Sequence, residues 1–170
     1  TYCMPEQGNE WLARSSILPL DEIERVARVA AAAGITTFRL TGGEPLLRAD
    51  IVEVVARLAA IETPEGERVH LAMTTNGIRL PELLPGLIAA GLGRLNISID
   101  TLRRERFADL TRRDRLDDVL EGIATAAASG LRPLKLNAVA MRGVNDDELV
   151  ELVEFAMSFG AQLRFIEQMP

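Results

Sequence analysis

The sequence predicts an α/β fold: a partial (β/α) barrel of the TIM type, with an open parallel sheet of about five strands and helices on its outer face. Three observations predict this fold. Strand-like and helix-like segments alternate along the chain, which is typical of parallel strands joined by helical crossovers. Each strand-like segment carries polar side chains on only one of its faces. Glycine and polar residues collect where these segments end, which is where barrels of this kind place their sites.

Five helices are predicted from apolar side chains that recur at helical spacing. Asp21 is expected to cap the first of them, as the first residue of a capping box. The second is expected from about Asp50, and the third opens at Pro81, because proline is tolerated in a first helical turn. Asp114 and Asn145 are expected to cap the fourth and the fifth.

Five strands are predicted, over residues 35–41, 69–75, 94–100, 134–140 and 162–167. In the third of them, residues 95, 97 and 99 are apolar while residues 96, 98 and 100 are polar, and alternate side chains of a strand point to opposite faces. A parallel sheet covered by helices on both sides would instead contain continuous apolar runs. The polar face therefore indicates a curved sheet that lines a lumen, rather than a flat, doubly wound sheet.

The composition is that of a soluble globular protein, and the chain is predicted to form a single domain over residues 1–170. A net charge of −6 argues against non-specific binding to nucleic acid. No apolar run approaches the roughly 18 residues that a membrane span needs. The one cysteine, Cys3, cannot form an internal disulfide, which fits a reducing, cytoplasmic location. The chain opens at Thr1 with residues typical of the middle of a protein, so we expect it to be a fragment.

Residues 39–50, RLTGGEPLLRAD, contain two glycines where a strand leads into a helix. A side chain at Gly42 or Gly43 would block anything that lies close to the backbone, so glycines at such a junction favour a bound ligand. A tight turn without a ligand is the alternative reading of the same residues.

Six segments together resemble the radical S-adenosylmethionine (radical SAM) superfamily and, within it, the family of GTP 3′,8-cyclases of molybdenum cofactor biosynthesis. They are TYCMP, RLTGGEPLLR, TTNG, GLGRLNISIDTL, LKLNAVAMRGVNDDE and LRFIEQMP. The resemblance covers essentially the whole chain, but only the last of the three cysteines in the family's C-x₃-C-x₂-C motif is present, as Cys3. The family's first strand and its C-terminal cysteines, which hold a second cluster, are also missing. We therefore expect an internal fragment that is inactive by itself.

The resemblance implies two cofactors, a [4Fe–4S] cluster and S-adenosylmethionine. Cys3 would give one thiolate to the cluster, since thiolates are the ligands that such clusters need; a lone cysteine is otherwise an ordinary buried or idle thiol. The resemblance places S-adenosylmethionine against Tyr2, Gly42, Gly43, Glu44, Ser98 and Met169. For Ser98 the alternative is a hydrogen bond to a neighbouring strand, and for Met169 a place in the core.

The resemblance also implies GTP as the substrate, held by Arg39, Thr74 and Lys135. Lys135 is conspicuous because every other basic residue, 18 in all, is arginine, and a compact ammonium differs from a planar guanidinium. Asn137 and Arg164 share its face of the sheet and are further candidates. A cation in a lumen needs a partner, so the alternative is an internal ion pair of Lys135 with Asp100 or Glu167.

The implied reaction is the abstraction of hydrogen from the 3′ carbon of GTP, followed by bond formation to C8 of guanine. A protein that donates electrons is an expected partner, and a homodimer is left open. Two other enzymatic functions also remain open: a different radical SAM enzyme, and a non-redox, phosphate-binding barrel in which Lys135 forms a Schiff base. A binding module without catalytic activity is the third alternative.

Overall fold

The computed structural model describes residues 16–168; the predicted site residues Tyr2, Cys3 and Met169 lie outside that range. Its elements, in chain order, are α1 (Leu20–Ala32), β1 (Thr37–Leu40), η2 (Pro45–Leu47), α2 (Ile51–Ala59), β2 (His70–Thr75), α3 (Leu80–Ala89), β3 (Arg94–Ser98), α4 (Arg104–Thr111), α5 (Leu116–Ala128), β4 (Leu134–Ala140), η3 (Asp146–Glu148), α6 (Leu149–Ser158) and β5 (Gln162–Glu167), where η marks a short 3₁₀ helix.

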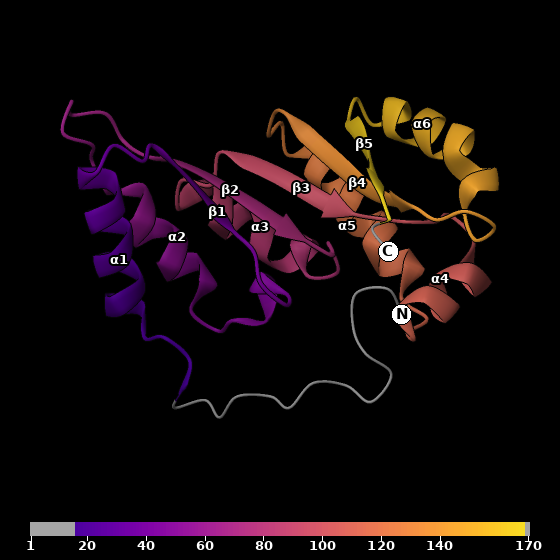
Figure 1. Cartoon of the computed structure of the whole chain (residues 1–170), viewed down its shortest axis with the longest axis horizontal. Coiled ribbons are helices and arrows are strands. Elements are labelled where there is room, and N and C mark those ends of the chain that lie inside the picture. The colour runs from indigo at the N-terminus through magenta and orange to yellow at the C-terminus, as the bar shows by residue number, and fades with distance from the viewer. Residues whose placement is uncertain (1–15, 169–170) are drawn as a thin grey trace.

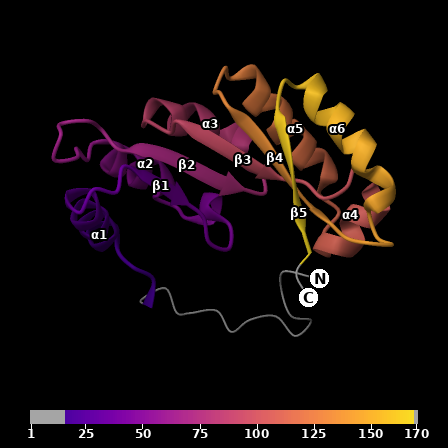
Figure 2. The same cartoon turned by 45° about the horizontal axis from the view of Figure 1, so that its top comes forward.

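The five strands form one sheet in chain order, β1-β2-β3-β4-β5, and all four pairings are parallel. Each strand lies within the range predicted for it. The strands fan out as an open arc, and helices α2, α3, α5 and α6 line one side of it (Figures 1 and 2). The predicted open parallel sheet with helices on its outer face is therefore confirmed.

The core lies between the sheet and these helices. Leu71, Met73, Leu95, Ile97 and Leu136 point to this side, and each is at most 1% exposed. Full burial of one such side chain stabilises the fold by about 1.5–3 kcal/mol. The alternate residues of the same strands face the other side of the sheet, and this placement produces the period of two that the sequence shows.

Two glycines allow helix α5 to approach the turn that follows β2. A Cβ built on Gly122 of α5 would lie 2.1 Å from the carbonyl oxygen of Gly77, far inside van der Waals contact. Gly77 has a φ of +84°, which favours glycine. The turn after β2 therefore packs directly against the backbone of α5, while β2 itself is paired with β1 and β3 in the sheet.

Three predicted helix caps are wrong, because nearby arginines and backbone groups compete for the same side chains. Helix α1 begins after Pro19 without a side-chain cap, and Asp21 instead accepts a hydrogen bond from Arg57 at 2.6 Å. Asp114 accepts from Arg104 at 2.8 Å and does not cap α5. Asn145 precedes η3 but uses its side chain to join the ends of two strands, as described below.

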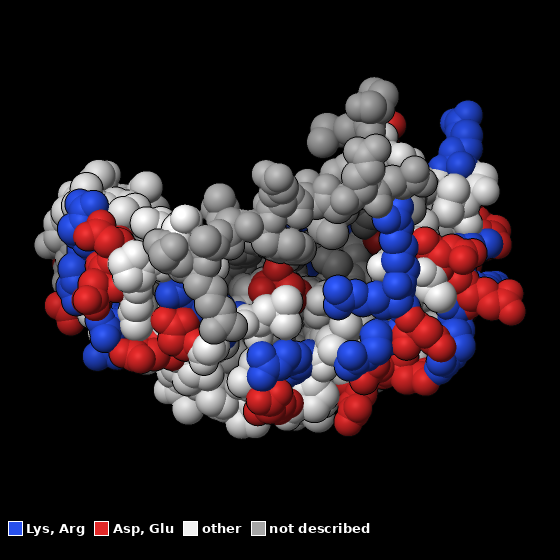
Figure 3. Space-filling model, turned by 90° about the horizontal axis from the view of Figure 1, so that it is seen from below, with Lys and Arg blue, Asp and Glu red and all other residues white. Residues whose placement is uncertain are grey.

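The outer surface carries many ion pairs within and between helices. Arg28 and Glu24 pair along α1 at 2.6 Å, and Arg103 pairs with Glu151 at 3.0 Å. Seen from below, basic and acidic groups are interspersed at both ends of the molecule, where α1 and α4 lie (Figure 3). Exposed pairs of this kind add little stability. Across residues 16–168, no helix has both the length and the apolar character needed to cross a membrane.

Candidate cofactor and substrate site

The turn after β1 leaves its backbone open on one side. Gly42 has a φ of +144°, a conformation that residues with a side chain rarely adopt. A Cβ built on Gly42 or Gly43 would meet no heavy atom within 4 Å among the described residues. This turn therefore has room for a group that lies directly on the backbone, which is where the family resemblance would place S-adenosylmethionine.

Glu44 ties this turn to the end of β2. Its Oε1 accepts hydrogen bonds from the hydroxyl of Thr75 at 2.6 Å and from the amide of Leu46 at 3.0 Å. Its Oε2 accepts from the amide of Asn76 at 2.7 Å. A carboxylate offers about four acceptor positions, and the protein itself occupies three of them. A direct bond from Glu44 to the cofactor stays a prediction, while its role in fixing the turn is observed.

Ser98 ends β3 on the polar face of the sheet and lies beside Asn137 of β4 in the strand register. The strand ends around it are joined by a second set of hydrogen bonds. Asp100 Oδ1 accepts from the amide of Val139 at 2.8 Å, and the Asn145 side-chain amide donates to the carbonyl oxygens of both residues, at 2.7 and 2.8 Å. Ser98 therefore stands on a braced part of the sheet, where its exposed hydroxyl can reach a ligand.

Arg39 is held in place on the polar face by two neighbours. Its Nη1 lies 3.3 Å from Thr74 Oγ1 of the adjacent strand. With the Asn96 amide turned so that its oxygen faces the guanidinium, the same Nη1 lies 2.5 Å from that oxygen. These contacts fix one side of the guanidinium and leave its other donors for a ligand.

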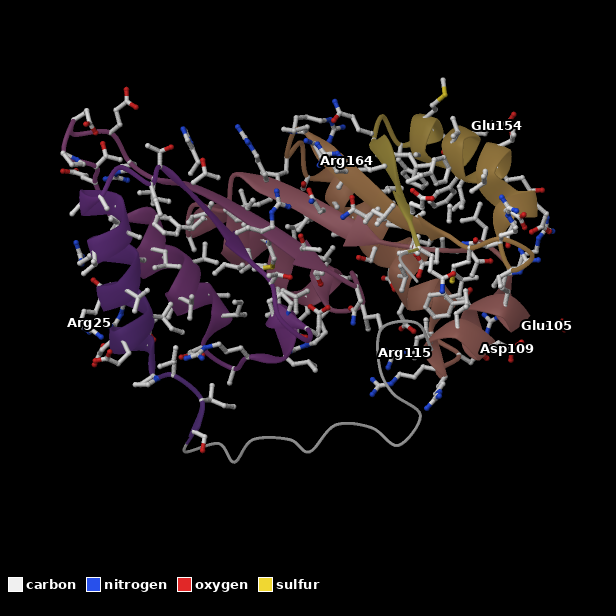
Figure 4. The ribbon with its side chains drawn as sticks, in the orientation of Figure 1. Arg25, Glu105, Asp109, Arg115, Glu154 and Arg164 are labelled. Atoms are coloured by element: carbon white, nitrogen blue, oxygen red, sulfur yellow. The ribbon has the colours of Figure 1, made fainter. Side chains whose placement is uncertain are left out.

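Lys135 lies among other cations. In the register it stands between Asn96 of β3 and Gln162 of β5, with Arg164 two residues further along β5. Burial lowers the pKa of Lys135, and the charges of Arg164, Arg94 and Arg39 lower it further. In Figure 4, Arg164 extends over the sheet, whereas Arg25 and Glu154 point outwards from α1 and α6.

No acid within the described residues pairs with any of these four cations, Arg39, Arg94, Lys135 and Arg164. The ion pair of Lys135 with Asp100 or Glu167, the alternative left by the sequence, is therefore contradicted for this part of the chain. Four like charges on one face of a sheet repel one another, and a bound anion would relieve that repulsion. This group of residues is referred to below as the cation cluster.

The structure thus brings together most of the predicted site residues that it describes. Arg39, Thr74 and Lys135 share the polar face, along with the further candidates Asn137 and Arg164. Gly42, Gly43, Glu44 and Ser98 lie at the carboxyl ends of β1 and β3. Among residues 16–168, no three His, Cys, Asp or Glu side chains are grouped so that they could hold a metal ion. The roles of Tyr2, Cys3 and Met169 stay predictions.

Two residues of this region, Arg94 and Thr75, were not among those predicted from the sequence. Arg94 opens β3 in phase with Asn96 and Ser98, so the period of two could have placed it on the polar face. Thr75 is 2% exposed and sits in the apolar phase of β2. Its partner Glu44 is 31 residues away, and no local pattern reveals such a contact.

Comparison with known proteins agrees with this geometry. The family profile described as "Radical SAM superfamily" matches residues 1–156. The chain is 53% identical to a GTP 3′,8-cyclase of Corynebacterium glutamicum and 52% identical to one of Streptomyces coelicolor, each over 171 aligned positions and all of this chain. It covers 45% and 49% of those two proteins, and so spans about half the length of the curated relatives it matches.

A likeness to solved structures supports the same fold. The crystal structure of HydG, a maturase of the [FeFe]-hydrogenase, superposes with a TM-score of 0.73 at 15% identity, over 95% of this chain and 38% of that one. At such low identity the likeness concerns the fold alone. The profile match, by contrast, extends over far more than half of the 170 residues. It includes the glycine turn and three members of the cation cluster, Arg39, Arg94 and Lys135. The chain belongs to the radical SAM superfamily.

Proposed function

We propose that the protein to which this chain belongs is a GTP 3′,8-cyclase, which converts GTP to (8S)-3′,8-cyclo-7,8-dihydroguanosine 5′-triphosphate in the first step of molybdenum cofactor biosynthesis. The single observation that carries the proposal is the cation cluster: four cations on one face of the sheet with no acidic partner among the described residues. Its charge matches that of a nucleoside triphosphate. The cyclases of C. glutamicum and S. coelicolor, at 53% and 52% identity, support the choice of GTP.

The proposed cofactors are a [4Fe–4S] cluster, to which Cys3 would contribute one thiolate, and S-adenosylmethionine. The fit of the second is supported by the open backbone at Gly42 and Gly43, a space that a Cβ would fill. Tyr2, Ser98 and Met169 would complete its site. When bound, the two cofactors together would supply a 5′-deoxyadenosyl radical able to abstract the hydrogen from the 3′ carbon of the ribose.

The residues of this chain would hold the substrate and keep it in one orientation. Arg39, already fixed on one side by Thr74 and Asn96, would present its free donors to phosphate oxygens. Lys135 would act as a mobile point charge among several oxygens. The triphosphate would neutralise the cluster and thereby raise the lowered pKa of Lys135. With its phosphates bound by the cation cluster, GTP would extend its ribose and base towards the glycine turn, which lies at the carboxyl end of β1.

The proposal includes a protein that donates electrons to the cluster and a cytoplasmic location, which the single cysteine supports. It also keeps the homodimer that the sequence left open, which light scattering on the full-length protein would test. The family match removes the non-redox barrel from consideration. A different radical SAM enzyme, acting on a substrate other than a nucleotide, is the reading that an experiment has to exclude.

The test uses the full-length enzyme with its cluster reconstituted anaerobically. We expect it to bind GTP in the micromolar to millimolar range that is typical of enzyme substrates. It should bind guanosine much more weakly, because guanosine has no phosphates for the cation cluster to bind. With a reductant and S-adenosylmethionine, mass spectrometry should detect an isomer of GTP. Equal affinity for GTP and guanosine, or a preference for a peptide, would contradict the proposal.

A further inference from the structure

The contact between Thr75 and Glu44 occurs a second time in the molecule, with the same pattern of donors and acceptors. In the first case the Thr75 hydroxyl donates to Glu44 Oε1 at 2.6 Å, the next amide, of Asn76, donates to Oε2 at 2.7 Å, and the Gly77 amide donates back to the hydroxyl at 3.1 Å. We call this arrangement a threonine–glutamate clamp.

The second clamp joins Thr101 to Glu148. The Thr101 hydroxyl donates to Glu148 Oε1 at 2.6 Å, the Leu102 amide donates to Oε2 at 2.8 Å, and the Arg103 amide donates to the hydroxyl at 3.1 Å. Arg106 also pairs with Glu148. In both clamps a buried threonine holds a glutamate from the segment that follows a neighbouring strand. Thr75 is the last residue of β2 and holds Glu44, which follows β1, whereas Thr101 follows β3 and holds Glu148, which follows β4.

The two clamps differ in what they hold. Glu44 immediately follows Gly42 and Gly43, and the clamp therefore fixes the end of the open turn. Arg79 reinforces it by donating to the carbonyl oxygen of Leu46 at 2.6 Å. Glu148 lies in η3, and no glycine adjoins it: the preceding glycine, Gly143, lies five residues earlier and is not among the residues proposed to bind a ligand. Both threonines are equally buried, at 2% and 0% exposed.

Thr75 is 2% exposed, and its hydroxyl bonds only to Glu44 and to the Gly77 amide among the described residues. Of these two partners, Glu44 is the one that adjoins the open turn, so an effect of Thr75 on a ligand at that turn would pass through Glu44. Three hydrogen bonds hold the Glu44 carboxylate in one orientation. Because Glu44 directly follows Gly42 and Gly43, the same bonds also restrain the C-terminal end of the glycine turn. Glycine is the most flexible residue. A turn that contains two glycines therefore needs such a restraint if it is to be preorganised for ligand binding.

We propose that Thr75 is a positioning residue for the cofactor turn: its hydroxyl holds Glu44, and through Glu44 it keeps Gly42 and Gly43 in the conformation that receives S-adenosylmethionine. This inference deepens the proposed function and rests on it. The second clamp, Thr101 with Glu148, has the same chemistry but serves only the stability of the fold, which makes it a matched control.

The experiment compares three variants of the full-length, reconstituted enzyme. Thr75→Val removes the hydroxyl but keeps the shape, Thr75→Ser restores the hydroxyl, and Thr101→Val removes the equivalent hydroxyl in the second clamp. Calorimetry gives the Kd values for S-adenosylmethionine and for GTP, thermal unfolding gives the stability, and electron paramagnetic resonance of the reduced cluster reports whether added S-adenosylmethionine changes its spectrum.

We expect Thr75→Val to raise the Kd for S-adenosylmethionine by about tenfold or more, the usual scale for a lost hydrogen bond to a charged group, while the Kd for GTP changes less than about twofold. Thr75→Ser should return the first value to near that of the wild type. Thr101→Val should lower the melting temperature about as much as Thr75→Val and leave both Kd values nearly unchanged. Among the three variants, only Thr75→Val should need a higher concentration of S-adenosylmethionine than the wild type to change the electron paramagnetic resonance spectrum of the cluster.

Equal effects of Thr75→Val and Thr101→Val on S-adenosylmethionine binding would overturn the inference, as would equal losses of both ligands in Thr75→Val. If Thr75→Val does not fold, Arg79→Gln tests the same turn, because it removes the hydrogen bond from Arg79 to the Leu46 carbonyl oxygen. This variant should show a smaller loss of affinity, again selective for S-adenosylmethionine. An equal loss of affinity for GTP would count against the inference. Wild-type enzyme that binds no S-adenosylmethionine would overturn the proposed function as well, whereas normal wild-type binding without a selective loss overturns the inference alone.

Discussion

Replacement of Gly43 by valine should separate cofactor binding from folding. In the structure nothing lies within 4 Å of a Cβ built on Gly43, and its φ is outside the positive range that L residues avoid, unlike the +144° of Gly42. The Cβ of a valine would therefore clash with no protein atom of the described residues. It would instead occupy the space proposed for S-adenosylmethionine.

The structure sets the size of both effects. Replacing a glycine at a compatible backbone conformation changes stability by about 0.4–1 kcal/mol, usually in the favourable direction, so the melting temperature should stay within about 4 °C of the wild type. Forcing extra atoms into an occupied contact costs about 1–3 kcal/mol, which corresponds to a roughly 5- to 160-fold higher Kd for S-adenosylmethionine. The Kd for GTP should change little.

Calorimetry and thermal unfolding of the full-length enzyme measure the two quantities side by side. Gly42→Ala is the matched variant for strain: at a φ of +144°, a side chain costs about 1–3 kcal/mol of folding free energy, so this variant should melt earlier. If Gly43→Val binds S-adenosylmethionine as well as the wild type does, or loses both ligands and its stability together, the turn is merely structural and does not receive the cofactor.

Three further outcomes follow from the cation cluster and from the core. Lys135→Ala should weaken GTP binding by about 10- to 100-fold, the range for one charge-assisted hydrogen bond, and should leave S-adenosylmethionine binding unchanged. If calorimetry shows unaltered GTP affinity and the melting temperature falls, Lys135 stabilises the fold and does not bind GTP. The wild-type Kd for GTP should rise as the pH rises through the pKa of Lys135, which lies below its ordinary value of 10.5. Lys135→Arg, which stays charged, should lose this pH dependence. Gly122→Ala, whose Cβ would lie 2.1 Å from the Gly77 oxygen, should destabilise the fold by about 1–3 kcal/mol, and an unchanged urea midpoint would contradict the close packing of α5.

The sheet and its polar face could be predicted because they depend on local alternation. Leu95 and Ile97 face the helices while Asn96 and Ser98 face the other side, and a period of two is visible in any single strand. The position of the site at the strand ends follows from parallel strands alone. Individual roles in that site came from the resemblance to a family, not from spacing.

Features that depend on distant parts of the chain could not be predicted. Asp21 and Asp114 look like helix caps, but Arg57 and Arg104 bind them across 36 and 10 residues. Thr75 looks like one more residue of a buried strand, and only the folded chain brings Glu44 to it. In each case a side chain has two possible partners, and tertiary structure, not the local sequence, decides between them.

Transfer of hydrogen from the substrate to 5′-deoxyadenosine would show whether the full-length enzyme acts on GTP. The full-length, reconstituted enzyme would be given a reductant, S-adenosylmethionine and GTP deuterated at the 3′ carbon, and the 5′-deoxyadenosine formed would be analysed by mass spectrometry. We expect one deuterium in that product, no transfer from GTP deuterated at other ribose carbons, and a large loss of the label in Lys135→Ala at limiting GTP. 5′-Deoxyadenosine that forms without deuterium, or at the same rate when GTP is left out, would show that GTP is not the substrate held by this sheet.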